Sequence, residues 1–417
     1  MQTRVLQSAR SRMSVMAIDR RTFLELLPVS AAAFGAAPAS SPEVVGRHRA
    51  RDLGVTIGRL TPGPLNAITD VPGVEVGHST IVHGSGPLEV GKGPARTGVT
   101  AIWPHRRIIE EYVPCGASMP NANGELSGLV QARALGILGS PICLTNTSSV
   151  GEVYDALVDL LPADDLPAVV PIVGETWDAF LNDIEGRHVK REHVVEALDT
   201  SAGGAVEEGS VGGGTGMICY GFKGGIGTAS RKLSEPLASY TVGALVQANH
   251  GAREHFRIDG VPIGEEISDL LPGSAAPQSG NSILMIVATD VPLLDYQLDR
   301  VARRAVHGLA KTGSISSNSS GDFTFAFSTA NRIPRRQYWD GETFTLRSLE
   351  QFEINPVFEA CAEAVEEAII NALFMATDMD GRDGNRANAL PLDRTLASLE
   401  RHGRIDKTAT RGSHARL

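Results

Sequence analysis

The stretch SGNSILMIVATD, residues 279–290, decides how this chain folds. An apolar run, typical of a strand covered on both faces, begins directly after one hydroxyl side chain, that of Ser282. The Ser-Gly-Asn before it is small and flexible, whereas a buried strand normally begins through residues of mixed polarity. Ser282 is therefore either an ordinary residue at the start of a strand or a nucleophile held at a strand tip.

Apolar runs of the same kind recur along the chain and predict further strands, several of them covered on both faces. The run at 322–328 alternates instead, so that its three phenylalanines lie on one face. We expect this aromatic face to meet a layer of helices. The predicted strands cover residues 98–103, 141–144, 168–173, 217–221, 283–289 and 322–328.

Three segments between these runs have helical signals. Residues 293–311 repeat apolar side chains at helical spacing, with arginines outside the apolar stripe. A second helix, 356–374, begins with proline in its first turn and is expected to expose several glutamates. Residues 124–138 are a third candidate. Helices packed on sheets predict an α/β (α+β) protein with four layers, in the order helix, sheet, sheet, helix.

The composition is that of a globular protein with a sizeable core, with 42% hydrophobic and 21% charged residues and 45 glycines. Between residues 60 and 395 the sequence has neither a Pro/Ser-rich linker nor a block of charge, and it has no repeat of fixed period. One large domain is therefore expected over the residues that follow the N-terminal segment.

The first 39 residues differ from the rest of the chain. Paired arginines at 20–21 precede Phe-Leu, and an Ala-rich, weakly apolar segment ends in Ala-Pro-Ala at 37–39. This pattern predicts a twin-arginine export signal over 1–39, and hence a periplasmic or secreted protein. A buried amphipathic helix is the alternative. Because Glu25 and Pro28 interrupt the apolar segment, it is too short to remain as a membrane anchor.

Charge and cysteine content exclude several classes of protein. Removal of residues 1–39 would take away five arginines and two acidic residues and change the net charge from −10 to −13. A negative charge of this size opposes binding to nucleic acid or to anionic membranes. The four cysteines are widely spaced and include no CxxC pair, so buried free thiols are expected: Cys115, Cys143, Cys219 and Cys361.

A serine nucleophile needs a group that takes its proton and a group that stabilises the oxyanion. Ser282 is one candidate part. The serine-rich segment 313–323 leads to Asp322, at the start of the predicted strand 322–328. Its composition is equally consistent with a solvated loop. In 242–251, Asn249 ends an apolar strand and is placed to direct an amide N–H at a developing oxyanion.

Neither a phosphate cradle nor a metal site is expected. The Gly-rich segment 209–230 lacks the Gly-Lys-Ser/Thr ending of a P-loop, and we interpret it as a strand hairpin with close backbone approach. The histidines do not form HExxH or another metal spacing. In the acidic segment 378–383, Arg382 stands where an EF-hand needs an oxygen ligand. We therefore expect no cofactor, and a turn near the site at 378–383.

Ten motifs cover almost the whole chain after residue 64 in order. They are LNAITDVPGVEVGHST (65–80), RTGVTAIWP (96–104), NGELSGL (123–129), LTNTSSVGEVYDAL (144–157), VGETWD (173–178), VGGGTGMICYGFKGGIGTASR (211–231), VQANHG (246–251), GNSILMIVATD (280–290), SSGDF (319–323) and GRDGN (381–385). Together they resemble the self-processing serine aminopeptidases, which include the L-aminopeptidase/D-amidase/D-esterase and the β-peptidyl aminopeptidases (peptidase family S58).

The resemblance implies an N-terminal-nucleophile type of fold in which the precursor cuts itself before its catalytic serine. It places the cut between Asn281 and Ser282, giving an α-chain of residues 40–281 and a β-chain of residues 282–417, both parts of one catalytic domain. The released α-amine, with a reference pKa near 8, would then assist proton transfer from its own hydroxyl.

The resemblance also implies roles for five side chains. Ser320 and Asp322 would be partners of the nucleophile, and whether Ser320 or the α-amine is the main base stays open. Asn249 would stabilise the oxyanion. Glu175 would receive the free amino group of the substrate, and Trp177 stands where some relatives have tyrosine. Many relatives have glutamate at the position of Asp322, which has a shorter side chain.

The predicted function is removal of N-terminal residues from short peptides, amides or esters through an acyl-enzyme, with L-, D- or β-amino acids as candidate residues. A homo-oligomer of processed units is expected from the resemblance alone. Two alternatives stay open: an acyltransferase of the same architecture, which transfers the acyl group to an amine, and a non-catalytic periplasmic binding protein.

Overall fold

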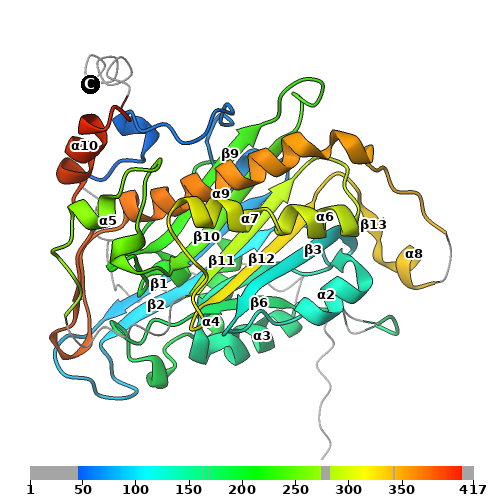
Figure 1. Cartoon of the computed structure of the whole chain (residues 1–417). Helices are drawn as coiled ribbons and strands as arrows, with labels where there is room; N and C mark the ends of the chain where they lie inside the picture. The colour runs from blue at the N-terminus through cyan, green and yellow to red at the C-terminus, as the bar shows by residue number, and fades with distance from the viewer. Residues whose placement is uncertain (1–45, 163, 168, 274–281, 341–342, 406–417) are drawn as a thin grey trace, which may run out of the picture. The chain divides into compact units, whose positions relative to one another are not determined.

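The structure is a computed structural model that describes residues 46–405 except 163, 168, 274–281 and 341–342. The predicted export signal over 1–39 and the residue Asn281 lie outside the described residues. Two β-sheets packed face to face form the centre of the described part, and helices cover their outer faces (Figure 1).

The larger sheet contains the strand that begins at Ser282. Its strands lie in the order β13-β3-β12-β11-β10-β9, with β4 paired to β3, and β11 and β12 run parallel. Strands from both sides of the predicted cleavage point therefore share this sheet. Their bounds are β3 (Glu111–Ala122), β4 (Ile137–Leu138), β9 (Gly225–Lys232), β10 (Thr241–Asn249), β11 (Ser282–Thr289), β12 (Gly321–Ser328) and β13 (Ile333–Pro334).

The smaller sheet has the order β1-β2-β5-β6 and is bonded to the larger one across their interface. The side-chain amide of Gln247 donates to the carbonyl oxygen of Thr145 at 2.9 Å and to Thr176 Oγ1 at 2.7 Å. The strands are β1 (Glu75–His83), β2 (Ala95–Trp103), β5 (Ile142–Asn146) and β6 (Ile172–Thr176); two short hairpins are β7 (Ile218–Cys219) with β8 (Phe222–Lys223), and β14 (Met379–Asp380) with β15 (Arg386–Ala387).

Helices complete the four layers. α9 lies against β9 and β10 while α6 lies against β3 and β12; on the other side, α4 covers β1 and β2, and α3 covers β5 and β6. The predicted order of helix, sheet, sheet, helix is confirmed. The α-helices are α2 (Leu129–Leu135), α3 (Val150–Val158), α4 (Arg191–Asp199), α5 (Ile263–Glu266), α6 (Asp295–Ala302), α7 (Ala305–Lys311), α8 (Arg335–Trp339), α9 (Asn355–Met375) and α10 (Leu392–Arg401).

Several sequence predictions need correction. The strand predicted at 168–173 begins only at Ile172 and continues to Thr176. The one predicted at 217–221 is a two-residue strand, because Tyr220 and Gly221 form a turn with φ of +51° and +69°. The helix predicted over 293–311 is two helices, and the one over 124–138 is limited to α2.

The break between α6 and α7 has a local cause. The main-chain N–H of Arg304 donates to the carbonyl of Val301, three residues back, and the Arg304 guanidinium lies 4.0 Å from the centre of the Phe358 ring on α9. The bend therefore keeps both helices packed on α9.

The layer predicted to cover the aromatic face of β12 is also wrong. Phe323, Phe325 and Phe327 belong to the core that includes both sheets, together with residues such as Leu144 and Leu284. The opposite face of β12, including Ala326, meets the helices instead. The three phenylalanines do share one face of the strand, as predicted, but two sheets, rather than a sheet and a helix layer, enclose them.

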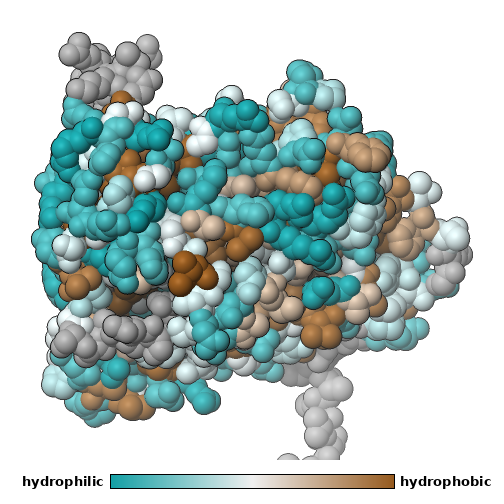
Figure 2. All heavy atoms as spheres, viewed as in Figure 1, coloured by the Kyte–Doolittle hydropathy of each residue, from teal (hydrophilic) through white to brown (hydrophobic). Residues whose placement is uncertain are grey.

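The surface and the thiols agree with the composition. The face over α6, α7 and α9 is mostly hydrophilic, with apolar side chains in small separate groups (Figure 2). Among the residues that the structure describes, no helix carries an apolar stretch long enough to cross a membrane. All four cysteines are buried and free, which confirms the prediction for them.

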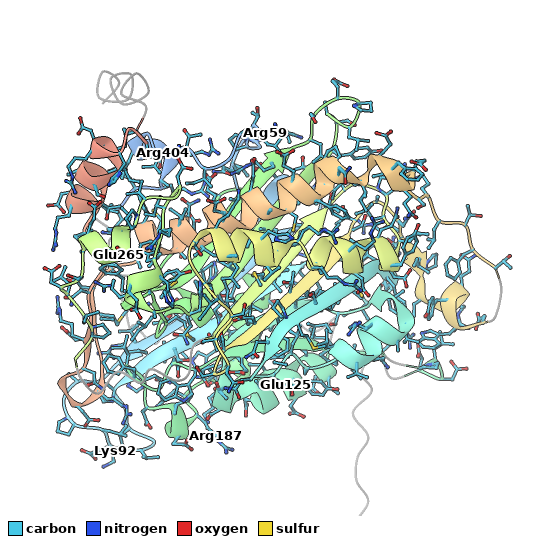
Figure 3. The ribbon with its side chains drawn as sticks, viewed as in Figure 1. Arg59, Lys92, Glu125, Arg187, Glu265 and Arg404 are labelled. Atoms are coloured by element: carbon cyan, nitrogen blue, oxygen red, sulfur yellow. The ribbon has the colours of Figure 1, made fainter. Side chains whose placement is uncertain are left out.

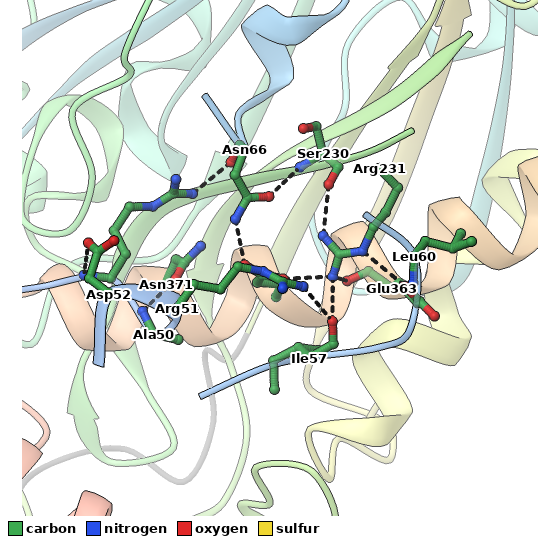
Figure 4. Close-up of polar contacts among 12 residues, drawn as sticks. Ala50, Arg51, Asp52, Ile57, Leu60, Asn66, Ser230, Arg231, Glu363 and Asn371 are labelled. Atoms are coloured by element: carbon green, nitrogen blue, oxygen red, sulfur yellow. Dashed lines mark hydrogen bonds and ion pairs between the residues drawn. The ribbon is translucent and has the colours of Figure 1, made fainter. Parts of the chain in front are cut away.

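The glutamates of α9 were expected to be exposed, but three of them are buried: Glu363, Glu366 and Glu367. Arg231 of β9, itself fully buried, explains two of these (Figure 4). Its guanidinium contacts Glu363 Oε2 at 2.9 Å and Glu367 Oε2 at 2.6 Å, and also donates to the carbonyl of Ile57 at 2.8 Å. Because buried charges need partners, this ion-pair cluster holds α9 on β9.

The same cluster fixes the beginning of the described chain. Arg51 Nε donates to Glu367 at 2.8 Å, and the side-chain amide of Asn66 donates to Glu367 at 2.5 Å and accepts from the main chain of Ser230 at 3.0 Å (Figure 4). The segment that precedes β1 is therefore bonded to the helix and to β9.

Replacing Arg231 by methionine should lower the free energy of unfolding by about 3–5 kcal/mol, because two buried carboxylates lose their common partner. Urea-induced unfolding followed by circular dichroism measures the change. Arg59→Met is the matched control, since that arginine pairs with Glu359 at the surface and its loss should leave the midpoint close to wild type. Equal midpoints for the two variants would show that the buried pairs do not contribute as stated.

Candidate active site

Ser282 is the first residue of β11 and is buried, with 4% of its surface exposed. In the sheet register it lies opposite Asn249 of β10 on one side and Gly321 of β12 on the other. The main-chain N–H of Gly321 donates to Ser282 Oγ at 3.2 Å. Main-chain pairing on both sides therefore fixes the position of this hydroxyl.

Ser320 and Asp322 flank that glycine. Ser320 Oγ donates to Asp322 Oδ1 at a short 2.5 Å, and both side chains are buried. Because the hydroxyl proton of Ser320 is directed to the carboxylate, its lone pairs are the part that can accept a proton from another donor. The structure thus brings together all three residues that the sequence predicted from two separate segments.

Burial raises the pKa of Asp322, and the hydrogen bonds from Ser320 and Ser316 oppose this effect. Desolvation disfavours the charged carboxylate, whereas hydrogen bonds to it favour the charged form. The Asp322 carboxyl is thereby more basic than an exposed aspartate, which suits a group that shares a proton with Ser320.

The side-chain amide of Asn249 is held at both ends. Its Oδ1 accepts from the main-chain N–H of Ile218 at 2.8 Å, and its Nδ2 donates to the carbonyl oxygen of Trp177 at 2.9 Å. These two bonds set which end of the amide is the donor. A side-chain amide fixed on the strand that pairs with Ser282 is the type of donor that stabilises an oxyanion.

Trp177 contributes to the site through its main chain as well as its ring. The carbonyl oxygen binds Asn249, while the indole is partly buried in a small apolar cluster with Phe180, Leu181 and Met379. The acidic segment 378–383, predicted to be a turn near the site, contains β14 and a short 3-10 helix, and its Met379 packs beside the tryptophan.

Glu175 lies near the end of β6 and is almost fully buried. Its Oε1 accepts from the main-chain N–H of Glu125 at 2.9 Å, and its Oε2 accepts from Thr147 Oγ1. Burial raises the pKa of Glu175, and these two hydrogen bonds oppose the shift. Glu125 itself is exposed and is labelled in Figure 3.

A close approach at Gly124 connects this carboxylate with the serine. A Cβ atom added to Gly124 would lie 2.8 Å from Glu175 Oε1 and 3.4 Å from the Cα of Gly321. Gly321 in turn donates to Ser282. Gly124 therefore lies between the ends of β6 and β12, and this close approach places the buried carboxylate and the nucleophile candidate in one site.

Two contributors were not predicted. Thr147 follows β5 and binds Glu175, and Ile218 presents its N–H to Asn249. A threonine directly after an apolar strand was a usable signal for the first. Ile218 acts through its main-chain N–H, so the identity of its side chain gives no sign of this role.

The residues together provide a buried hydroxyl, a carboxylate that orients a second hydroxyl, a fixed amide donor and a carboxylate for a cation. These are the parts of acyl transfer through a serine ester. Among the described residues, no three His, Cys, Asp or Glu side chains are grouped so as to hold a metal ion.

Comparison with known proteins assigns the family. The family model of peptidase family S58 matches residues 66–387. The β-peptidyl aminopeptidase BapA of Sphingosinicella microcystinivorans is 43% identical over 385 residues, which cover 89% of this chain and 95% of that protein.

Solved structures agree in fold. The β-aminopeptidase of a Burkholderia species is 44% identical and superimposes with a TM-score of 0.77 over 85% of this chain and 99% of that one. The L-aminopeptidase D-Ala-esterase/amidase of Ochrobactrum anthropi, described as a prototype of the serine aminopeptidases and a variant of the Ntn-hydrolase fold, is 41% identical, with a TM-score of 0.80 over 86% and 99%. From this sequence identity and this shared architecture around the serine site, the chain belongs to peptidase family S58 and is a serine aminopeptidase of the Ntn-hydrolase fold.

Proposed function

We propose that Ser282 is the nucleophile of this aminopeptidase and that it becomes a chain terminus by cleaving the bond after Asn281. The observation that carries the proposal is the position of Ser282 between Asn249 and Gly321, with the Ser320–Asp322 pair directly beside it. The register neighbours alone are common to any central strand; the buried Ser320–Asp322 hydrogen bond beside a buried serine is what a purely structural residue does not need.

The self-cleavage proceeds in two steps. Ser282 Oγ attacks the carbonyl carbon of Asn281, and the peptide C–N bond breaks as the acyl group moves to the hydroxyl, which leaves an ester and a free α-amine. Water then hydrolyses the ester, giving the carboxylate of Asn281 and restoring the hydroxyl. The products are the α-chain, residues 40–281 after export, and the β-chain, residues 282–417.

Turnover repeats this chemistry on a substrate. Ser282 Oγ attacks the scissile carbonyl while its proton passes to Ser320, which Asp322 orients, or to the Ser282 α-amine. Asn249 Nδ2 would donate to the oxyanion of the tetrahedral intermediate. The leaving amine takes the proton and departs, and water resolves the acyl-enzyme by the same route in reverse.

Glu175 explains why such an enzyme would act at the N-terminus. A buried carboxylate near the nucleophile stabilises a protonated amine at a fixed distance from the scissile bond, and an internal peptide bond has no such amine. Short peptides, amides and esters with a free amino group therefore fit the site. The half-buried indole of Trp177 would form part of its apolar wall.

We infer that β-amino acids are among the N-terminal residues removed. Support comes from the 43% identity to the β-peptidyl aminopeptidase BapA of S. microcystinivorans and the 44% identity to the β-aminopeptidase of a Burkholderia species. The β-homoalanine, L-alanine and D-alanine p-nitroanilides are the substrates to compare, and the highest kcat/KM is expected for the β-amino acid.

The twin-arginine pattern supports export to the periplasm or beyond, with removal of residues 1–39. We further propose a homo-oligomer of processed units. Intact-mass analysis of protein from the periplasm and size-exclusion chromatography with light scattering test these two proposals separately.

Replacement of Ser282 by alanine should give one undivided chain and lower the hydrolysis of amino-acid p-nitroanilides by a factor on the order of 10⁶, because the attacking atom is lost in both reactions. Denaturing electrophoresis and N-terminal sequencing check the chain, which in the wild type should yield a fragment that begins with Ser282. Ser319→Ala, in the same serine-rich segment, should process and turn over normally. An undivided wild-type chain with full activity would reject the proposal.

The acid limb of kcat/KM should lie above the usual carboxyl range. A free carboxyl side chain has a pKa near 4, and burial raises the pKa of both Glu175 and Asp322. As the pH falls, these carboxylates are neutralised earlier than exposed ones, so amine binding and proton transfer are lost earlier. Activity profiles from about pH 4 to pH 8 measure the limb; a midpoint at the ordinary carboxyl value would contradict both assignments.

Glu175→Gln should raise KM for substrates with a free amino group by roughly 10- to 100-fold, with a smaller change in kcat, because a neutral amide keeps the shape but loses the charge that binds the cation. Steady-state kinetics of the processed variant test this. Glu185→Gln, at an exposed position, is the matched control. A fall in kcat at unchanged KM would instead assign Glu175 to the transition state alone.

A further inference from the structure

Lys223 is a fully buried lysine beside the active site that the mechanism does not use. It ends β8 and lies directly opposite Ile218 in the hairpin of β7 and β8. The turn of that hairpin is formed by Tyr220 and Gly221, which both have positive φ, as in the tight turns typical of two-residue hairpins.

The ammonium group of Lys223 joins the two ends of this hairpin. Its Nζ donates to the carbonyl oxygen of Gly214, before the hairpin, at 3.0 Å, and to that of Gly224, after it, at 2.8 Å. The main chain closes the same gap, since the N–H of Gly224 donates to the carbonyl of Met217 at 2.9 Å. Loss of the ammonium would remove both side-chain bonds, so that only main-chain bonds would hold the hairpin, among them those from Tyr220 to His250 and from Lys223 to Asn388, both 2.7 Å.

The hairpin that Lys223 closes carries the N–H that orients Asn249. Ile218, the cross-strand partner of Lys223, donates its main-chain N–H to Asn249 Oδ1. A shift of β7 would lengthen this bond and release the amide to rotate. Since an oxyanion donor acts through a fixed position, a small rotation is enough to weaken it.

Asp178 packs against the same loop. It follows Trp177, whose carbonyl oxygen accepts from Asn249 Nδ2. A Cβ added at Gly216 would lie 2.8 Å from the Cβ of Asp178, so this side chain packs against the chain that leads into β7. The groups that hold both ends of the Asn249 amide are thus adjacent to buried ionisable residues of opposite sign.

Burial shifts the pKa values of both ionisable residues beside the hairpin. Burial lowers the pKa of Lys223 to about 7, with Cys219 and Asp178 opposing the shift. Burial raises the pKa of Asp178 to about 7, with hydrogen bonds, among them one from Asn182, opposing it. Burying a charged group at such a position costs free energy unless hydrogen bonds compensate for its desolvation. An apolar side chain of similar length would not carry this cost.

We propose that Lys223 is a positioning residue for catalysis: by joining the carbonyls of Gly214 and Gly224, it fixes the Ile218 N–H and thereby directs the amide of Asn249 at the oxyanion. The inference rests on the proposed role of Asn249. It adds a residue that touches neither substrate nor nucleophile and that acts through a main-chain group.

The test compares an amino-acid p-nitroanilide with the matching thioanilide. Sulfur accepts hydrogen bonds weakly, so the thioanilide gains little from an oxyanion donor. Lys223→Met should lower kcat for the anilide by roughly 10- to 100-fold, lower kcat for the thioanilide much less, and leave both KM values nearly unchanged. Rates are divided by the fraction of processed chain, measured by intact mass.

Lys232→Met is the matched control, since this lysine bonds Thr241 at the far end of β9 and should leave both substrates unaffected. Asn249→Ala should show the same selective loss of anilide turnover; if that variant is fully active, the proposed role of Asn249 fails, and this inference fails with it. If Ser282 is required for activity but Lys223→Met lowers turnover of the anilide and the thioanilide to the same extent, this inference alone would be overturned.

Lys223→Gln keeps a shorter N–H donor and should recover part of the anilide rate. It also serves where the methionine variant does not accumulate in folded form. Unfolding of both variants would overturn the proposal, because it would assign Lys223 to the stability of the whole fold, and so would turnover of both substrates at the wild-type rate.

Discussion

The site depends on the register of three neighbouring strands. Asn249, Ser282 and Gly321 lie side by side because β10, β11 and β12 pair without a slip at their ends. A shift of one residue would turn each side chain to the opposite face of the sheet. The apolar residues of β11 alternate between the inter-sheet core and the helix layer, so the energy of burial on both faces fixes the register. The precision of the chemistry thus derives from packing that extends far from the site.

The central strand and its first residue could be predicted from the sequence because the signal is local. An apolar run that starts at one hydroxyl defines β11, and the alternation in 322–328 defines β12. Family resemblance then supplied the partners of Ser282. The described geometry is consistent with those roles, since Ser320 is bonded to Asp322 and Asn249 lies across from Ser282.

What could not be predicted depends on contacts between distant parts of the chain. The glutamates of α9 follow an exposed pattern, and cations from distant segments, above all Arg231 on β9, make their burial favourable. The role of Ile218 lies in its main chain and leaves no mark on residue type. The phenylalanines of β12 were assigned to the correct face, but the layer that covers it was not, because alternation shows which residues share a face and not what lies opposite.

The larger sheet contains strands from both sides of the bond after Asn281, with β10 and β11 as direct neighbours across it. Before the proposed cleavage, folding is a unimolecular event in which the covalent link keeps the two parts at high local concentration. After cleavage, the same pairing would have to form between separate molecules. Recovery from full denaturation would then be second order in protein and slower on dilution, so the mature enzyme would owe its persistence to slow unfolding more than to its ability to refold.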